Sequence, residues 1–529
     1  MSTTVGATVH ADLAATHLMR RPVRAALLAF DLGSTSVKAL LLTAETGAPI
    51  AIARRTTSGG PDPREQDADA WWRAICAASQ EVLALAVAQS AGEIQIRGIG
   101  VDGHGPSLVP VRADGSAAGP ALMWRDRRSA DDEVVLAQIL GRGGWLLGEL
   151  PKARWLLRER PEVAAASAWF LSSWDALTLR LSGEAVSSFW DPARSVSPAQ
   201  RSALLAAGVD ERALPPEVFP GTRIGTLLPG PSAELGLAPG VPIAAGMNDG
   251  LAAVIGAGLT EPKLGVDVGG TAGGVAVAVT MAEARRIATA LPGRLWSGPT
   301  PAPLGDGAIL GGAFAGTGRL LEWVVTELLA NDPTAAPARR AELFRAAAVL
   351  PLGADGLMAK PIFNRGWSSP RTVDDAFVGR TDQHTAAHLV RAAIESGALT
   401  VAHLLSPAIK AGLQISEIRL SGPATGAAPG PLSGGEPVPA PLIQLRADLF
   451  GSPVVIGQNA EASGAGAAAL AGVAGGSFAN LREASQAVAA PEQRIEPSAS
   501  AHDRAMELLG RFSQLSVAAG GSGAGRRED

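Results

Sequence analysis

One short pattern occurs twice in the chain, once near the start of each half. Both copies read Asp-x-Gly-x-Thr after an apolar residue, within FDLGSTSVKALLL and VDVGGTAGGVAVA. The matching residues are Asp31, Gly33 and Thr35 in the first copy and Asp267, Gly269 and Thr271 in the second. Apolar runs flank each copy, which predicts a strand, a tight turn and a second strand.

A Gly-rich hairpin turn points backbone N–H groups and hydroxyls at whatever lies over it, and glycine lets that object come close to the backbone. Backbone amides that converge on one point bind anions such as phosphate. Two such hairpins predict two similar domains that hold one polyphosphate between them. The alternative is two unrelated hairpins, because Gly-rich turns are common and the chain has 63 glycines.

Composition narrows the class of protein. A chain of 529 residues is expected to form two or three domains, and 47% apolar with 18% charged residues is ordinary for a soluble enzyme. The net charge of −5, with Lys and Arg scattered, argues against a nucleic-acid partner. The single cysteine, Cys76, excludes an intrachain disulfide and fits a reducing compartment, so we expect a cytoplasmic protein. No apolar run approaches the length that spans a membrane.

Local patterns predict the main elements and the domain division. Apolar periodicity predicts strands at 26–31, 37–43 and 95–102, and helices at 68–88, 151–182, 321–330 and 462–474. A Gly-rich loop is expected at 310–318. We expect a flexible leader over 1–24, a first domain over 25–262, a second domain over 263–515 and a disordered tail over 516–529.

Several phosphate and metal motifs are missing. The chain has no GxxxxGK[ST] and no well-placed GxGxxG, which argues against a Walker-type NTPase and a dinucleotide dehydrogenase. His384 and His388 are four residues apart, but HExxH is absent, so they are expected to be helix-surface residues rather than zinc ligands.

Several segments together resemble the FGGY family of carbohydrate kinases, and the resemblance runs over about 27–475. The segments are LLAFDLGSTSVKA, EQDADAWW, GIGVDGHGPSLV, ALMWRDRRS, FLSSWDALTLRLSGE, AAGMNDGLAAVIGAG, LIQLRADLFGSPV and EASGAGAAALAG. EQDADAWW and WRDRR are xylulokinase-like. The resemblance implies an α/β fold of two actin-like (ribonuclease H-like) ATPase domains with an interdomain cleft. It implies ATP-dependent phosphorylation of a hydroxyl of a small sugar, ketose or polyol.

The first half is expected to carry the chemistry. By resemblance, Asp249 in GMNDG matches the catalytic aspartate, and the dipole of the helix that follows is expected to keep it ionised as a general base. Asp31 ends a strand where phosphates would lie and would be repelled by them unless Mg²⁺ lay between, so it is a metal-side residue. The other readings are a helix N-cap for Asp249 and a turn cap for Asp31. Lys38 is expected to point outward, with no role.

Further residues are expected to line the acceptor and nucleotide sites. By resemblance Trp124 and Asp126 lie at the sugar, and Asp102 and His104 stand where the family more usually has Ser and Gln. Arg125, Arg127 and Arg128 are equally consistent with a solvated face. The predicted nucleotide residues are Gly33, Ser34, Thr35, Ser36, Gly270, Thr271, Gly312, Gly316 and Gly422. Residues 364–370 depart from the family pattern, which affects the expected nucleotide preference.

Two other classes remain open. A nucleotide- and sugar-binding regulator or pseudokinase of the same fold would keep these motifs without turnover, although the intact Asp31 and Asp249 argue against it. An actin-like filament or chaperone ATPase would not need Trp124 and Asp126. The expected cofactors are ATP and Mg²⁺, the expected partner is a sugar or polyol, and a homodimer is the alternative to a monomer.

Overall fold

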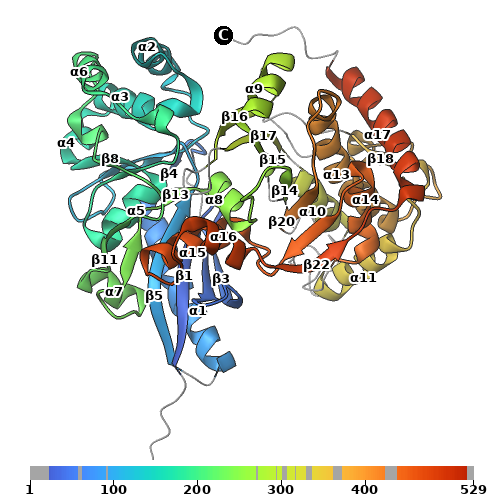
Figure 1. Cartoon of the computed structure of the whole chain (residues 1–529), viewed down its shortest axis with the longest axis horizontal. Helices are drawn as coiled ribbons and strands as arrows, with labels where there is room; N and C mark the ends of the chain where they lie inside the picture. Colours follow the sequence, from blue (N-terminus) through green and yellow to red (C-terminus); the bar gives the residue numbers. More distant parts are fainter. Residues whose placement is uncertain are drawn as a thin grey trace, which may run out of the picture.

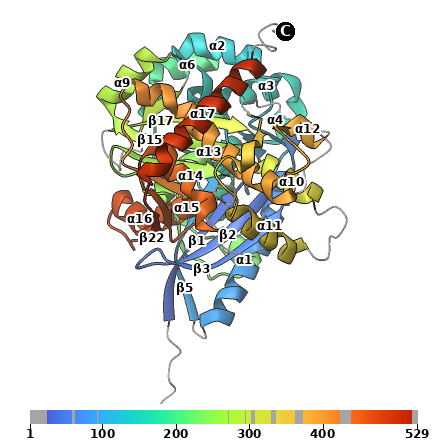
Figure 2. The ribbon, with the colours of Figure 1, turned by 90° about the vertical axis from the view of Figure 1, so that its right-hand side faces the viewer.

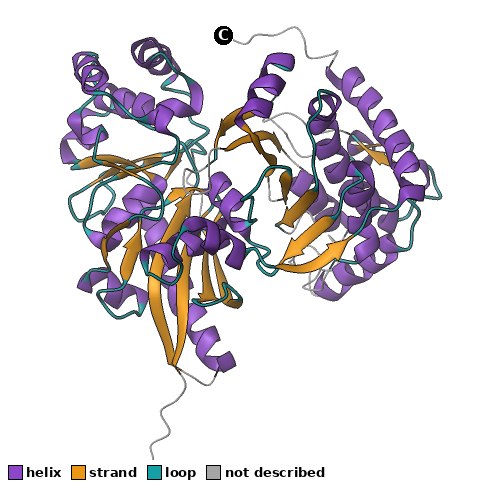
Figure 3. Ribbon diagram, in the orientation of Figure 1, coloured by secondary structure: helices purple, strands orange, loops and turns teal. Residues whose placement is uncertain are grey.

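The computed structural model of the chain describes residues 23–57, 62–90, 93–269, 272–292, 295–300, 307–315, 317–328, 336–360, 372–422 and 438–520. Two halves lie side by side, and each has a sheet with helices packed around it (Figures 1 and 3). The predicted α/β class is therefore confirmed.

The first half is built on a seven-stranded mixed sheet. Its strand order is β11-β12-β5-β1-β2-β3, and β13 also pairs with β5. The strands are β1 (Val23–Leu32), β2 (Ser36–Thr43), β3 (Pro49–Thr56), β5 (Glu93–Gly103), β11 (Arg223–Thr226), β12 (Pro242–Ala244) and β13 (Met247–Asn248).

The second half has a seven-stranded sheet of its own, in the order β16-β17-β15-β14-β20-β21-β22. Its strands are β14 (Leu264–Gly269), β15 (Ala272–Thr280), β16 (Trp296–Pro299), β17 (Gly307–Ala315), β20 (Glu417–Ser421), β21 (Val454–Gly457) and β22 (Pro491–Ile495). Most of the stretch predicted to be a Gly-rich loop at 310–318 is therefore strand β17, because it pairs along its whole length with β15.

The two sheets share one topological core. In the first, β1, β2 and β3 form an antiparallel meander, and β5 pairs with β1 in parallel. In the second, β14, β15 and β17 form the meander, and β20 pairs with β14 in parallel. Each repeated motif opens its meander as the first hairpin, so both predicted hairpins are confirmed.

Side chains along β1 point alternately to the two faces of the first sheet, and both faces are covered by helices. Leu28 and Phe30 belong to the apolar cluster that includes helix α1 (Ala68–Ser90). Leu27 and Ala29 belong to the cluster that includes helix α15 (Ala462–Ala474). Successive side chains of a strand point to opposite faces, so a strand buried on both faces reads as a continuous apolar run.

Helix α15 comes late in the chain but packs on the first half, where it contacts β1, β5 and helix α8 (Asp249–Gly256). Figures 1 and 2 show it beside the blue strands. Glycines make the approach possible: a Cβ on Gly100 would run into the carbonyl oxygen of Ala467, and one on Gly466 into that of Ala252. The domain division at 262/263 remains a proposal. Helix α15 belongs to the second expected domain by sequence but packs on the first.

A four-stranded sheet extends the first half, in the order β4 (Glu65–Gln66), β7 (Ala121–Leu122), β6 (Leu108–Val111) and β8 (Trp169–Ser172). The stretch predicted as helical, 151–182, contains β8 between its helices, so that part of the prediction is wrong. The cause is that the apolar run in β8 pairs antiparallel with β6. The helices are α3 (Leu150–Glu159), α4 (Pro161–Ala166) and α5 (Ser173–Ser182).

Helices α10 (Thr317–Leu328), α13 (Ala386–Lys410) and α14 (Ala440–Phe450) form the core of the second half with its sheet. Within the described residues, α13 is the one helix long and apolar enough by composition to cross a membrane, but most of it is buried in this core. Helix α17 (Ala499–Gly520) covers α13 and α14 and is the dark red helix in Figure 2.

Candidate active site

Three aspartates meet at the carboxyl ends of adjacent strands in the first sheet. Asp31 on β1 lies directly opposite Asp102 on β5, and Asp102 is also paired with Met247 on β13. Asp249 follows β13 as the first residue of α8. Asp31 and Asp102 are buried and Asp249 is partly buried. Strand order thus brings together three acids from distant parts of the sequence.

Their mutual proximity changes how they ionise. Burial, and then the charge of Asp31, raise the pKa of Asp249 to about 7. Burial and the charges of Asp31 and Asp249 raise the pKa of Asp102 well above its usual range. The helix end therefore does not keep Asp249 fully ionised at neutral pH. The hydrogen bond from the Gly250 N–H, 2.7 Å long, favours the ionised form but does not outweigh burial and the neighbouring acid.

The carboxylates fit a hard divalent cation. Both side-chain oxygens of Asp102 are buried without a hydrogen-bond partner. Among the described residues no three His, Cys, Asp or Glu side chains are arranged to hold a metal ion by themselves. Mg²⁺ is usually held by one or two carboxylates and by substrate phosphates, so Asp31 and Asp102 suit it.

Lys38 forms ion pairs that its position in the sequence did not indicate. It is opposite Asp31 in the β1–β2 register, and its Nζ lies 2.8 Å from Asp31 Oδ2 and 2.7 Å from Glu461 Oε2. Burial alone would lower the pKa of Lys38, but the charges of Asp31 and Glu461 raise it above its usual value. The expectation that Lys38 points outward is therefore wrong. The hairpin register was the available signal, because it places these two residues face to face.

The turn between β1 and β2 is tied to the acceptor residues. The Gly33 N–H donates to the Ser36 carbonyl over 3.0 Å and closes the turn. Trp124 Nε1 donates to Ser34 Oγ over 2.9 Å, and Gln66 Nε2 donates to the Ser34 carbonyl over 3.0 Å. The predicted phosphate turn and the predicted sugar residue Trp124 therefore lie together, and the side chain of Thr35 is exposed.

His104 lies beside this group and is almost fully buried. Its Nδ1 is 2.8 Å from Ser107 Oγ, its Nε2 has no partner, and its ring packs edge-on against Trp71. Burial lowers the pKa of His104 to about 4, so the imidazole is neutral at pH 7. A neutral imidazole offers one donor and one acceptor, as a glutamine does.

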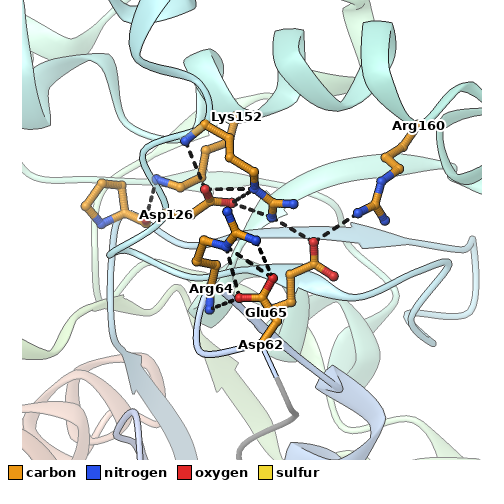
Figure 4. Close-up of polar contacts among 8 residues, drawn as sticks. Asp62, Arg64, Glu65, Asp126, Lys152 and Arg160 are labelled. Atoms are coloured by element: carbon orange, nitrogen blue, oxygen red, sulfur yellow. Dashed lines mark hydrogen bonds and ion pairs between the residues drawn. The ribbon is translucent and has the colours of Figure 1, made fainter. Parts of the chain in front are cut away.

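Asp126 is held by an arginine network (Figure 4). Arg128 binds both carboxylate oxygens of Asp126, at 3.0 Å and 2.7 Å, and also donates to Glu65 Oε1 over 2.7 Å. Glu65 accepts a further bond from Arg160, and Arg128 lies over the ring of Trp155. Arg128 is thus a structural partner of Asp126 and not part of a solvated face, whereas Arg127 is exposed.

Lys152 is a further buried cation that the sequence analysis did not single out. It lies on α3, and its Nζ donates to the Pro106 carbonyl over 3.1 Å, as Figure 4 shows. Burial lowers the pKa of Lys152. Because Pro106 belongs to the same turn as His104, Lys152 supports that turn.

On the nucleotide side, Gly422 follows β20 with a φ of 82°, and its backbone approaches that of Gly269 so closely that a Cβ would collide there. Gly312 lies within β17, where a Cβ would run into Leu404. The roles of both toward a nucleotide remain predictions. Four predicted features lie outside the described residues: Gly270, Thr271, Gly316 and 364–370.

The two repeated aspartates differ in their surroundings. Asp267 on β14 is buried and accepts a 2.7 Å hydrogen bond from Arg446 on α14. Burial raises the pKa of Asp267, and Arg446 opposes that shift. The repeat thus preserves the hairpin, but in the part of the chain that the structure describes Asp31 lies beside two further aspartates, whereas Asp267 is paired with an arginine.

Two other features lie apart from the aspartates. His388 is buried and its Nε2 is 3.1 Å from Asp355 Oδ2, so the expectation of a surface position is wrong for this histidine.

A cavity of about 390 Å³ lies near α3 and β8 and is lined by Arg142, Glu149, Asp175 and Arg194 among others. None of the predicted site residues lines that cavity.

Comparison with known proteins agrees with this arrangement. The N-terminal domain of the FGGY family of carbohydrate kinases matches residues 26–256, and the C-terminal domain matches 279–475. The xylulose kinase of Escherichia coli is 29% identical over 46% of this chain and 53% of its own length. The matched region thus spans about half the length of this xylulose kinase and of those from Streptomyces coelicolor and Streptomyces rubiginosus. The glycerol kinase of Bordetella parapertussis is 29% identical over 86% of this chain and 90% of its own length.

A solved structure extends the likeness to the whole fold. The xylulose kinase of Rhodospirillum rubrum superimposes with a TM-score of 0.66 at 26% identity, covering 93% of this chain and 98% of the other. The two family domains together match most of the chain; the first match ends with α8 and the second begins near the end of β15. The chain therefore belongs to the FGGY family of carbohydrate kinases and has their actin-like ATPase fold.

Proposed function

We propose that the protein catalyses ATP-dependent phosphorylation of a hydroxyl of a small sugar, ketose or polyol, in the manner of a xylulokinase, with Asp249 as general base. The observation that carries this proposal is the position of Asp249. It lies beside Asp31, at the strand ends next to the turn at Ser34, and its pKa of about 7 suits proton acceptance near neutral pH.

Each residue group has a defined task in this proposal. The backbone and hydroxyls of the turn at 33–36 bind phosphate oxygens, and Trp124 covers the C–H face of the acceptor while Asp126 accepts from its hydroxyls. Asp31 and Asp102 would hold Mg²⁺, which neutralises charge on the transferred phosphoryl group when bound. Asp249 accepts the proton of the attacking hydroxyl, and closure of the two halves excludes water.

A coupled ADP-release assay across ketoses, polyols and aldonates tests the proposal. We expect Mg²⁺ and ATP to give ADP release that depends on one class of acceptor. Asp249→Asn should reduce turnover by about 10²-fold or more while acceptor binding survives, since the amide keeps the shape and one acceptor oxygen. Acceptor binding without ADP release in the unaltered protein would favour a regulator or pseudokinase instead.

The remaining proposals concern setting and partners. A cytoplasmic location, the absence of nucleic-acid and membrane partners, and a monomer or homodimer are consistent with the acidic net charge and the single cysteine. The domain division at 262/263, with a leader over 1–24 and a tail over 516–529, belongs to the same set.

A further inference from the structure

A partly buried chain of ion pairs joins the two halves of the protein at the candidate active site. Lys38 on β2 contacts Asp31 of the first half and Glu461, which lies 423 residues later in the sequence. Glu461 also accepts from Arg54 on β3 over 3.1 Å. The side chains of Lys38 and Asp31 are 16% and 6% exposed, and that of Glu461 is 21% exposed. A charge pair this sheltered is screened less by salt than a surface pair.

Glu461 lies where the chain crosses from the second sheet to the first. It follows β21 and immediately precedes α15, which packs on β1 and β5. Its neighbours are bonded to the end of β20, because the Gly422 N–H donates to the Ala460 carbonyl over 2.8 Å and the Ala462 N–H donates to Ser421 Oγ over 3.1 Å. Gly422 is the predicted nucleotide-side glycine. Residues 460–462 thus contact the end of β20. Through Glu461 and then Lys38 they are also linked to the Asp31 carboxylate.

We propose that Glu461 is a positioning residue that acts through Lys38 and ties the Asp31 carboxylate to the strand end at Gly422. This proposal rests on the proposed function, since it concerns the part of the candidate active site that would bind the nucleotide and Mg²⁺. Its consequence is that nucleotide placement in the second half and carboxylate placement in the first half are coupled.

Charge sharing gives the physical reason. Lys38 has two carboxylate partners, so its ammonium lies between them and binds only one oxygen of Asp31, Oδ2. Without the charge of Glu461, Lys38 would move toward Asp31 and occupy lone pairs that a divalent cation needs. An ammonium on a flexible four-carbon stem makes this shift readily. A shift of less than about one ångström in such a side chain is enough to weaken a ligand site.

Glu461→Gln tests the proposal, and Glu417→Gln is its matched control. Like Glu461, Glu417 pairs with two cationic side chains, here Arg419 and Arg494, and it is 16% exposed, but it lies at the opposite end of β20. Calorimetric titration with ADP and Mg²⁺, without acceptor, is the first readout. We expect Glu461→Gln to weaken ADP binding in Mg²⁺ by about tenfold, a size typical of losing a charged partner, and Glu417→Gln to leave it within twofold.

Kinetics and a double variant separate positioning from general loss of structure. Glu461→Gln should lower kcat and raise KM for ATP while KM for the acceptor and the melting temperature match those of Glu417→Gln. In a Lys38→Met background the same substitution should add nothing further, because the coupling runs through Lys38.

Three outcomes would overturn the inference: unchanged ADP affinity in Glu461→Gln, an equal loss in Glu417→Gln, or additive losses with Lys38→Met. ADP binding is measured without turnover. A protein that binds ADP as described but phosphorylates no acceptor would therefore contradict the proposed function and still support the role of Glu461.

Discussion

Asp249 is held close to half-ionised at neutral pH by burial and by the charge of Asp31, which together raise its pKa to about 7. A base must lose its proton before it can accept another, so the ionised fraction, and with it activity, should rise with pH through this value. His104 does not contribute to this change, because burial lowers its pKa to about 4.

We therefore expect kcat/KM for the acceptor to rise between pH 5.5 and 7.5, by about tenfold per pH unit at the low end, and then to level off. The measurement is a pH profile at saturating Mg²⁺ and ATP. His104→Gln should keep this rise of kcat/KM with pH, since residue 104 is neutral throughout the range. A flat profile would exclude Asp249 as a group that titrates during the reaction.

The same raised pKa has a cost in stability. In the unfolded chain Asp249 titrates near 4, so between that pH and about 7 only the folded state holds the proton. Stability from this group is thus fully present at pH 4 and is lost as pH rises toward 7. Asp249→Asn should be more stable than the unaltered protein at pH 8, by on the order of 1–3 kcal/mol, and similar at pH 4.5. Urea unfolding at the two pH values checks this, and an equal difference at both would contradict it.

Acceptor choice should depend on His104. Its Nε2 is buried without a partner, and a site that pairs with one hydroxyl discriminates against acceptors lacking it. His104→Gln should stay active but change the ranking of acceptors, with ATP affinity unchanged. The test compares kcat/KM over an acceptor panel for both proteins, and an identical ranking would return His104 to a purely structural place in its turn.

Short motifs in the sequence singled out Asp31 and Asp249 as candidates, and the fold brings both to adjoining strand ends. Sequence reasoning missed Lys38 and Glu461, because an ion pair across 423 residues depends on how α15 folds back. It also misjudged how Asp249 ionises, since the dominant causes are burial and a neighbour on another strand, and neither is local in sequence.

At the scale of elements, the packing of α15 on α8 is set by glycine. The carbonyl oxygen of Ala252 occupies the place that a side chain at Gly466 would need, so the two helix backbones nearly touch. The apolar periodicity predicts a helix over 462–474, and α15 has those bounds. Its partner was not predictable, because a run of alanine and glycine fits many surfaces.

Gly466→Ala should destabilise the protein by about 1–3 kcal/mol, since the methyl group would force the two backbones apart. Gly510→Ala is the control. Gly510 lies in α17 with nothing near its Cβ position, so alanine there should be neutral or stabilising by up to about 1 kcal/mol. Thermal or urea unfolding of both variants decides the matter, and similar effects from the two would show that α15 has room to adjust.

At the scale of the whole molecule, a repeated meander with a parallel strand beside it builds each sheet. The repeated motif predicted both hairpins, and apolar runs predicted the strands near 26–31, 37–43 and 95–102. The order of the remaining strands could not be predicted, because parallel neighbours such as β14 and β20 are separated by long stretches of chain. The assembled fold places the acids of one half next to the crossing segment of the other.

The return of α15 to the first sheet has a consequence for biosynthesis. A ribosome releases β1 and β5 long before it releases α15, and at typical elongation speeds the wait is on the order of tens of seconds. During that time the face of Leu27 and Ala29 lacks its cover. Exposed apolar surface of this kind makes a partly folded chain prone to aggregate, so we expect the first half to complete its fold only after α15 has been made.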